Sequence, residues 1–329
     1  MAISDGIIVI VSLALAPLCS RAFIGTSSPT TCTSPHLSHG WTRLGVTRHV
    51  KSSSNRSEHP SSPIRSCIPL AEPSAKEAGR ADVLELLFGA SYAYQERIQI
   101  GRQAQGFLTT DALAARTLVP PRELTYGEYD LDFFLSLVTE CLSVRAEKGE
   151  KGTPVGDLEA EARSLVFGDI GSGCGRLVLA QALTWPWRCC RGIEIVPSLH
   201  EMGEAALQAA DRVVKEDGNT LAPETLRLLR SMAPCSLSLG DVNDDVDISD
   251  MDVLFCYSSS FPAFGDLLTE LSYTLGHKLR PGAQVITTDR RLVSDGPWEF
   301  ALLREREGRN SETGGKSIAY IWQVVKSAL

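Results

Sequence analysis

The chain has 329 residues, of which 43% are hydrophobic and 22% charged, and its formal net charge is −8. This composition suffices for a packed globular core, and the length fits one large domain or two small ones. Residues 1–67 carry six basic and two acidic side chains, which leaves 26 basic and 38 acidic side chains for the rest. A body with a net charge of −12 excludes broad contact with a nucleic-acid backbone, although a local basic patch stays compatible with it.

The nine cysteines follow no regular framework, and no C-x-x-C pair occurs among them. Cys189 and Cys190 are adjacent in a predicted buried strand, where a free cysteine behaves as a small apolar residue. The sequence therefore indicates a reducing compartment and core packing, and it predicts no metal site.

Residues 1–70 are typical of a targeting segment. The apolar run 7–16 is too short to span a bilayer and is followed by small residues, which predicts a signal peptide over 1–20. Residues 21–70 are rich in Ser, Thr, Arg, His and Pro, as in a disordered transit segment. With Phe23 just after the expected cleavage point, the whole resembles the bipartite plastid presequence of algae with red-derived secondary plastids. We expect plastid import and no transmembrane segment in the mature chain; mitochondrion, secretory pathway and nucleus are the alternatives.

The remaining pattern predicts helices first and then an alternation of strands and helices. Apolar spacing predicts a helical N-terminal extension over 75–145, with helices at 75–98, 111–118 and 131–144, and a charged linker over 147–157. A domain over 160–329 follows, with strands at 164–170, 189–195, 235–239, 251–257 and 283–288, helices at 176–183, 199–214 and 264–279, and a terminal antiparallel pair at 298–306 and 317–325. This alternation predicts an α/β fold with a parallel sheet covered by helices on both faces.

A glycine-rich turn lies between the first predicted strand and its helix, with Gly171, Gly173 and Gly175 in the spacing G-x-G-x-G. Glycines there let the backbone approach a ligand, and the spacing differs from the G-x-G-x-x-G of dinucleotide enzymes. Glu194 ends the next strand, where a carboxylate can accept both ribose hydroxyls of an adenosine ligand. Asp241 follows the third strand and is placed to meet the adenine amine. Each feature alone is weak, but their order indicates an adenosyl site, with a nucleotide-binding dehydrogenase as the alternative.

The run from Asp169 to Arg176, with Glu194 and Asp241, resembles the class I S-adenosylmethionine-dependent methyltransferases. The Leu-Thr-Tyr-Gly-Glu stretch at 124–128 is similar to the non-SET histone-lysine methyltransferases of the disruptor-of-telomeric-silencing type. The resemblance implies a Rossmann-like methyltransferase sheet and S-adenosyl-L-methionine as cofactor. It also implies cofactor-binding roles for Asp169, Gly171, Gly173 and Gly175 at the methionine portion, Glu194 at the ribose, Asp241 at the adenine, and Tyr126 and Glu128 in a loop over the carboxylate and amine.

The chain departs from that family after the fourth predicted strand. The family has an Asn-Asn-Phe run there, whereas this chain has Tyr257 and Ser258, which can supply oxygens, and Phe261, which can wall a methylene stem. We expect these three residues to form the catalytic acceptor site; the alternative is a Ser-rich loop that only caps the next helix. A second departure is Arg176, where the family has Gln.

The expected function is protein-lysine N-methylation of an organellar protein by direct in-line displacement, which needs positioning and desolvation. The acidic body disfavours a nucleosome or other nucleic-acid partner. A small-molecule or lipid methyltransferase is the first alternative, because the terminal strand pair could wall a small apolar pocket. A non-enzymatic adenosyl-binding module is the second, although loss of Asp169 or Glu194 would have favoured it and both are present.

Overall fold

The computed structural model describes residues 75–89, 92–110, 126–148, 157–216, 221–244, 246–310 and 314–329. The predicted signal peptide, the transit segment, the helix at 111–118 and most of the linker lie outside these residues. All described residues belong to one compact unit, Arg65–Leu329, in which the predicted extension and the predicted domain share a hydrophobic core.

A seven-stranded sheet with the order β3-β2-β1-β4-β5-β7-β6 forms the centre of this unit. Its first five strands are parallel, and β7 runs antiparallel to both of its neighbours. The predicted α/β class, with a parallel sheet and a terminal antiparallel pair, is confirmed. The strands are β1 (Val166–Ile170), β2 (Cys189–Glu194), β3 (Cys235–Leu239), β4 (Val253–Cys256), β5 (Gln284–Thr288), β6 (Glu299–Arg309) and β7 (Lys316–Lys326).

The helices follow the predicted order, with two additional α-helices and the short 3-10 helix η1. Alpha helices α4 and α7 were not expected; Asp157 caps the first of them by accepting a hydrogen bond from the backbone N–H of Ala160 at 3.0 Å, and Pro223 begins the second. The helices are α1 (Ala75–Gly89), α2 (Tyr94–Thr110), α3 (Leu131–Lys148), α4 (Leu158–Ser164), α5 (Arg176–Thr184), α6 (Pro197–Glu216), α7 (Pro223–Arg230), η1 (Ser258–Ser260) and α8 (Thr269–Lys278).

Two predicted helices have different boundaries in the structure. The single helix expected over 75–98 is two helices, and α2 starts afresh because the Glu96 carboxylate accepts from the backbone N–H of Ala93 at 3.2 Å. The helix expected from residue 264 begins only at Thr269. Phe264 and Leu267 instead pair across a turn in which Gly265 has a φ of 66°.

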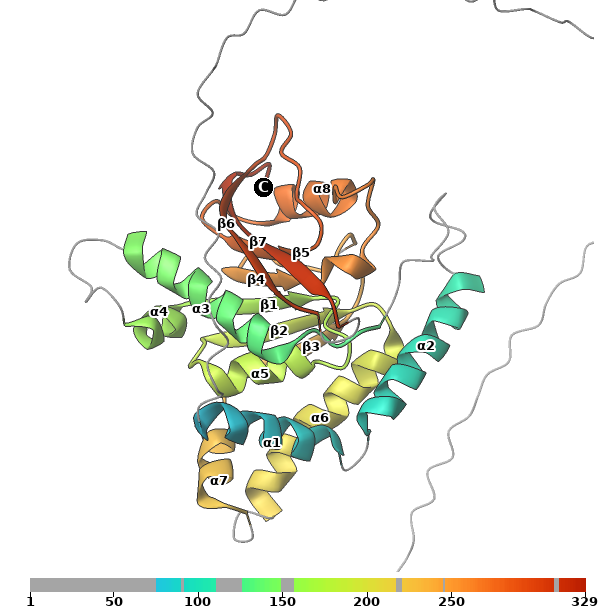
Figure 1. Cartoon of the computed structure of the whole chain (residues 1–329), viewed down its shortest axis with the longest axis vertical. Coiled ribbons are helices and arrows are strands. Elements are labelled where there is room, and N and C mark those ends of the chain that lie inside the picture. Colours follow the sequence, from blue (N-terminus) through green and yellow to red (C-terminus); the bar gives the residue numbers. More distant parts are fainter. Residues whose placement is uncertain are drawn as a thin grey trace, which may run out of the picture. The chain divides into compact units, whose positions relative to one another are not determined.

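Helices cover both faces of the sheet (Figure 1), as predicted. On one face, α5 and α6 contact the strands, and α1 packs outside them against α5, α6 and α7. On the other face, α8 buries Leu271 and Leu275 in a second core, which Leu279 joins directly after the helix. No helix within the described ranges is long and apolar enough to cross a membrane. Ligands of parallel α/β sheets bind at the edge where the strands have their carboxyl ends. We therefore expect a ligand site at the edge where β1 to β5 end.

Candidate functional site

The glycine-rich turn, Gly171–Gly175, leaves the carboxyl end of β1 and is fastened to β2. The N–H groups of Gly171 and Ser172 donate to the carbonyl of Ile193 at 2.8 and 2.9 Å. Gly171, Gly173 and Gly175 have φ angles of 74°, 56° and 75°, which side chains with a Cβ rarely adopt. The turn therefore keeps a bare backbone at the carboxyl edge of the sheet, as a cradle for a ligand requires.

Glu194, at the end of β2, fixes this turn through hydrogen bonds to its carboxylate. Its carboxylate accepts from the N–H of Gly173 at 2.6 Å and from the N–H of Val196 at 2.8 Å, and only 5% of the residue is exposed. Burial raises the pKa of Glu194, while the backbone hydrogen bonds oppose that shift. A ribose placed against Glu194 would meet a carboxylate whose position is fixed by the turn itself.

Asp169, in β1, is a second buried carboxylate at the same edge. Burial raises its pKa to about 8, and the charge of Glu194 adds to the shift. Two carboxylates that are costly to ionise together favour a ligand that brings hydroxyl groups or a positive charge. An adenosyl ligand with a methionine portion meets that condition, so these two carboxylates fit the expected cofactor.

Asp241 follows β3 beside Glu194. The N–H of Gly240 donates to the backbone carbonyl of Glu194 at 2.8 Å, which extends the pairing of the two strands to this point. The Asp241 carboxylate accepts from the N–H of Asn243 at 2.9 Å and so shapes its own turn. Asp241 and Glu194 thus stand at the ends of adjacent strands, as expected for contacts to the base and sugar of one nucleoside.

Tyr126 lies over the glycine-rich turn. Its hydroxyl is 3.1 Å from the Sγ of Cys174 and donates to the Glu128 carboxylate at 3.1 Å. A Cβ built at Gly173 would come within 2.8 Å of the Tyr126 ring, so the ring rests directly on the turn. The structure therefore brings together the loop and the turn that the sequence placed about forty residues apart.

Glu128 connects this loop to two arginines. Arg97, from α2, donates to both carboxylate oxygens at 2.6 and 3.1 Å, and the Nε of Arg176 lies 3.5 Å from the second oxygen. Sequence reasoning missed Arg97. Its only local signal is a basic residue inside the amphipathic pattern of α2, and nothing local shows that its partner lies 31 positions away.

Ser258, which the sequence predicts to be catalytic, is bonded on all sides within the protein. Its hydroxyl donates to the carbonyl of Cys256 at 3.0 Å and accepts from the N–H of Thr288 at 3.0 Å, while its own N–H donates to Thr288 Oγ1 at 3.0 Å. The residue is fully buried. The Ser258 side chain thus ties the end of β4 to the end of β5.

Tyr257 and Phe261, which follow β4, are both half-buried. A Cβ at Gly171 would lie 3.5 Å from the Phe261 ring, which is ordinary contact distance. The ring centroids of Tyr257 and Tyr129 are 5.1 Å apart, and Tyr129 also packs on Phe255. Phe261 therefore lies beside the turn and packs against the second core, whereas Tyr257 packs against the first core.

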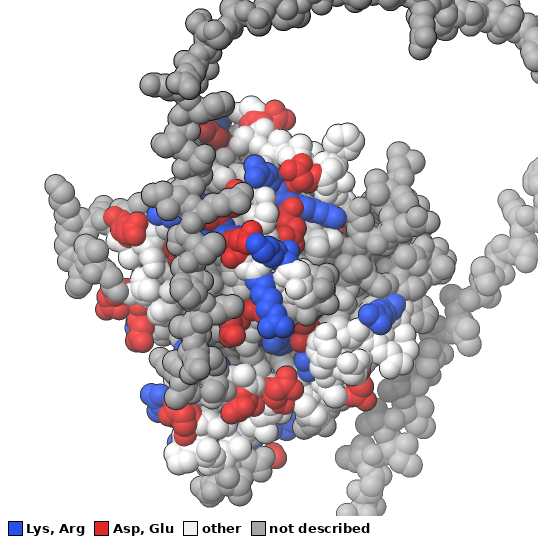
Figure 2. Space-filling model, in the orientation of Figure 1, with Lys and Arg blue, Asp and Glu red and all other residues white. Residues whose placement is uncertain are grey.

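Several charged side chains elsewhere on the unit lie in ion pairs. Figure 2 shows basic and acidic side chains interleaved on the visible face. On β6 and β7, Lys316 pairs with Glu307 at 2.5 Å, and Arg304 pairs with Glu140 at 3.5 Å. Among the described residues, no group of three or more His, Cys, Asp or Glu side chains could hold a metal ion.

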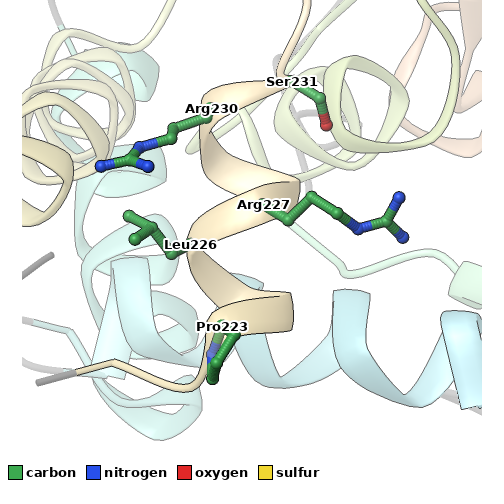
Figure 3. A pocket seen from close by; sticks show the side chains of 5 residues that line it. All are labelled: Pro223, Leu226, Arg227, Arg230 and Ser231. Carbon is green, nitrogen blue, oxygen red and sulfur yellow. The ribbon is translucent and has the colours of Figure 1, made fainter. Parts of the chain in front are cut away.

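A shallow hollow on α7 is a poor candidate for the site. Figure 3 shows its lining residues, all from this helix and its end, with the side chains of Arg227 and Arg230 directed away from each other. Arg227 is engaged with Glu224 at 2.7 and 3.0 Å. The hollow therefore offers no convergent polar groups, in contrast to the cradle at the carboxyl edge.

Strand order, an antiparallel β7 between β5 and β6, a G-x-G-x-G turn after β1 and an acidic residue at the end of β2 together decide the fold. It is the class I methyltransferase fold. No protein-family model matches the sequence, and no curated protein matches it.

Several solved structures are similar to this methyltransferase fold. An RNA methyltransferase from Salinibacter ruber, in complex with S-adenosyl-L-homocysteine, is 23% identical over 56% of this chain and 92% of its own, with a TM-score of 0.31. An rRNA methyltransferase from Streptomyces viridochromogenes is 16% identical over 62% and 87%, with a TM-score of 0.38. Magnesium protoporphyrin IX methyltransferase from Synechocystis, with bound S-adenosylmethionine, is 11% identical over 68% and 96%, with a TM-score of 0.37.

Proposed function

We propose that this chain is an S-adenosylmethionine-dependent methyltransferase whose acceptor is a lysine side chain of a protein. The observation that carries the cofactor assignment is the cradle itself. Bare backbone at Gly171 and Gly173 lies between a buried carboxylate on one side, Glu194, and the Tyr126 ring on the other. This arrangement suits a ligand with a ribose at one end and an amino acid at the other.

The cofactor, when bound, supplies an activated methyl group. Glu194 and Asp241 would hold its nucleoside, Asp169 would face its methionine portion, and Tyr126 would cover the turn and exclude water. Because the transfer is a direct displacement, positioning and desolvation by these residues provide most of what the reaction needs. The acceptor amine must reach the site without its proton, and an apolar wall favours the neutral amine.

Two features support a lysine acceptor. The Tyr126–Glu128 loop, whose sequence is similar to the histone-lysine methyltransferases, rests on the glycine-rich turn. The Phe261 ring lies at contact distance from Gly171 and suits the methylene stem of a lysine. Ser258 has no part in this proposal, because its hydroxyl is committed to β4 and β5.

Calorimetric titration of the full chain tests the cofactor assignment. We expect S-adenosylmethionine to bind in the micromolar range and NAD not to bind. Binding of neither ligand, by a chain shown to be folded, would overturn the proposal and favour a non-enzymatic domain.

A radiolabelled methyl donor tests the acceptor. The full chain is incubated with organellar extract, and we expect label that is sensitive to protease, insensitive to ribonuclease and recovered as methyl-lysine after hydrolysis. A Phe261→Ala variant should lower this labelling while leaving cofactor binding in place. Label that is sensitive to ribonuclease, or that is recovered in an organic extract, would contradict a lysine acceptor. It would indicate RNA or a lipid-like small molecule instead.

We also propose that the protein acts in a plastid, on the strength of the presequence pattern alone. A fluorescent fusion to residues 1–70 should reach the plastid of an alga with a secondary plastid. Nuclear or secreted fluorescence would refute this address.

A further inference from the structure

Three charged residues at the cradle, Arg97, Glu128 and Arg176, form a triad that spans from α2 to the start of α5. Only 1% of the Arg97 side chain is exposed, against 10% for Glu128 and 20% for Arg176. Charges this far from water must be paired, since removing an isolated one from solvent is very costly. The ion pairs within the triad therefore show which side chain keeps a charge that a ligand can pair with.

Arg97 is fully occupied within the protein. Besides the two bonds to Glu128, its Nη1 donates to the carbonyl of Tyr92 at 3.0 Å, and its guanidinium lies over the rings of Phe88 and Tyr94 at 5.2 and 5.8 Å. Burial alone would lower the pKa of Arg97, but hydrogen bonding and the charge of Glu128 raise it above its ordinary value. Arg97 is therefore a permanently charged, buried side chain whose hydrogen-bonding groups are used within the protein and not by a ligand.

Glu128 is equally occupied. One carboxylate oxygen accepts from Arg97 Nε and from the Tyr126 hydroxyl, and the other faces Arg97 Nη2 and Arg176 Nε. A carboxylate has about four lone-pair sites, so these contacts use its capacity. Glu128 therefore serves as the internal counter-ion of two arginines, and it is poorly placed to bind the ammonium group of the cofactor as well.

Arg176 carries the charge that remains. It is the first residue of α5, directly after Gly175, and its Nη1 donates to the carbonyl of Tyr129 at 3.3 Å. Two guanidinium groups against one carboxylate leave one positive charge, and the start of a helix adds a partial positive charge at the same place. Glu85, the other acid near Arg97 at 4.0 Å, is 64% exposed and screened by water.

We propose that Arg176 binds the carboxylate of the cofactor's methionine portion, and that Arg97 is the positioning residue that makes this possible. Arg97 neutralises Glu128, which would otherwise satisfy Arg176 and repel the incoming carboxylate. The inference rests on the proposed function, since it concerns one end of the same ligand. It assigns recognition of that end to the residue that stands where the similar family has Gln.

Two ligands that differ at this end provide the test. S-adenosylhomocysteine has the amino-acid carboxylate and ammonium, whereas 5′-methylthioadenosine keeps the nucleoside and the thioether but lacks both. Calorimetry with the full chain gives the ratio of the two dissociation constants. For Arg176→Met we expect S-adenosylhomocysteine affinity to fall about tenfold or more, as for a lost charged hydrogen bond, with methylthioadenosine affinity unchanged.

Further variants separate recognition from simple loss of structure. Arg97→Met should reduce the same ratio, and Arg97→Lys should restore part of it. Arg145→Met is the matched control: its side chain is 21% exposed and paired with Glu161 at 3.2 Å, but it bonds to Gly282 before β5, at the opposite edge of the sheet. This control should leave the ratio unchanged.

The outcomes distinguish the two proposals. If the wild-type chain binds both ligands and Arg176→Met weakens both equally, or neither, the triad is structural and this inference is wrong while the proposed function stands. If the folded wild-type chain binds neither ligand, the adenosyl site itself is refuted. Should Arg97→Met fail to fold, Arg176→Met and Arg97→Lys still decide the question.

Discussion

The Tyr126 side chain occupies the space beside α2 that a side chain at Gly101 would fill. A Cβ built at Gly101 of α2 would lie 2.6 Å from the Cγ of Tyr126, which is closer than real Cβ atoms approach. The same tyrosine ring covers Gly173 of the glycine-rich turn. Helix α2, the loop and the turn are therefore packed as one layer, and the position of Tyr126 depends on a helical glycine.

Gly101→Ala should displace Tyr126 from the turn. Alanine favours a helix over glycine by about 1 kcal/mol, yet we expect the variant to weaken S-adenosylmethionine binding several-fold because the ring must move. The matched control is Gly79→Ala in α1, where the new Cβ would meet only Leu228 at 3.6 Å. Calorimetry on both variants checks this, and equal affinities would show that the ring plays no part in the site.

Glu194→Gln should weaken both the turn and cofactor binding. One of the two backbone N–H groups that now donate to the carboxylate would face an amide NH₂ instead, and the charge would be lost. We expect cofactor binding to weaken by roughly 1–3 kcal/mol. Glu224→Gln, on the exposed surface of α7, is the control, and unchanged affinity in a folded Glu194→Gln variant would refute the ribose assignment.

Asp169 should make the unliganded protein less stable as pH rises. Its pKa in the fold is raised from 3.8 to about 8, mainly by burial. A carboxyl group with a raised pKa stabilises the fold fully below the unfolded value, and this contribution is lost as pH rises from about 4 to 8. Urea midpoints measured over that range should fall, and Asp169→Asn should flatten the slope.

Glu194 also contributes to the pH dependence of stability. Its pKa is also raised by burial, so part of the slope should persist in the Asp169→Asn variant. A midpoint that rises with pH in the wild-type chain would contradict the burial of both carboxylates.

Ser258→Ala should cost stability without a specific effect on methyl transfer. It removes the acceptor for the buried N–H of Thr288, which should cost about 1–3 kcal/mol. Ser136→Ala, whose exposed hydroxyl donates to the carbonyl of Phe133 in the same helix, α3, should be near neutral. Full stability combined with a large loss of turnover would instead support the catalytic role predicted from the sequence.

Local sequence patterns were sufficient to predict the positions of most strands of the sheet. The five parallel strands lie within a few residues of their predicted positions because short β-rich runs alternate with helical spacing. The glycine-rich turn and Glu194 were recognised by their order along the chain. In contrast, the extra start of α2 depends on hydrogen bonds between Glu96 and Ala93, a detail that apolar periodicity does not register.

Contacts between distant residues account for what the sequence did not show. Arg97 and Glu128 are joined only after α2 and the loop pack together. Residue type alone shows only that Ser258 can supply an oxygen to an acceptor site. That its hydroxyl accepts from the N–H of Thr288 in β5 depends on the fold of η1. Likewise, the pairing of Leu267 with Arg291 holds 264–268 out of the predicted helix.

The packing of α1 has a consequence for the order in which the chain folds. Val83, Leu84, Leu87 and Phe88 of this helix are buried, and α1 contacts α7, which begins at Pro223. Closing contacts between segments so far apart is slow, since a long loop must be ordered first. Until the second half of the chain is present, α1 has no surface to dock on. We therefore expect α1 to stay undocked during synthesis until α7 has emerged, so the first described helix is among the last to be packed.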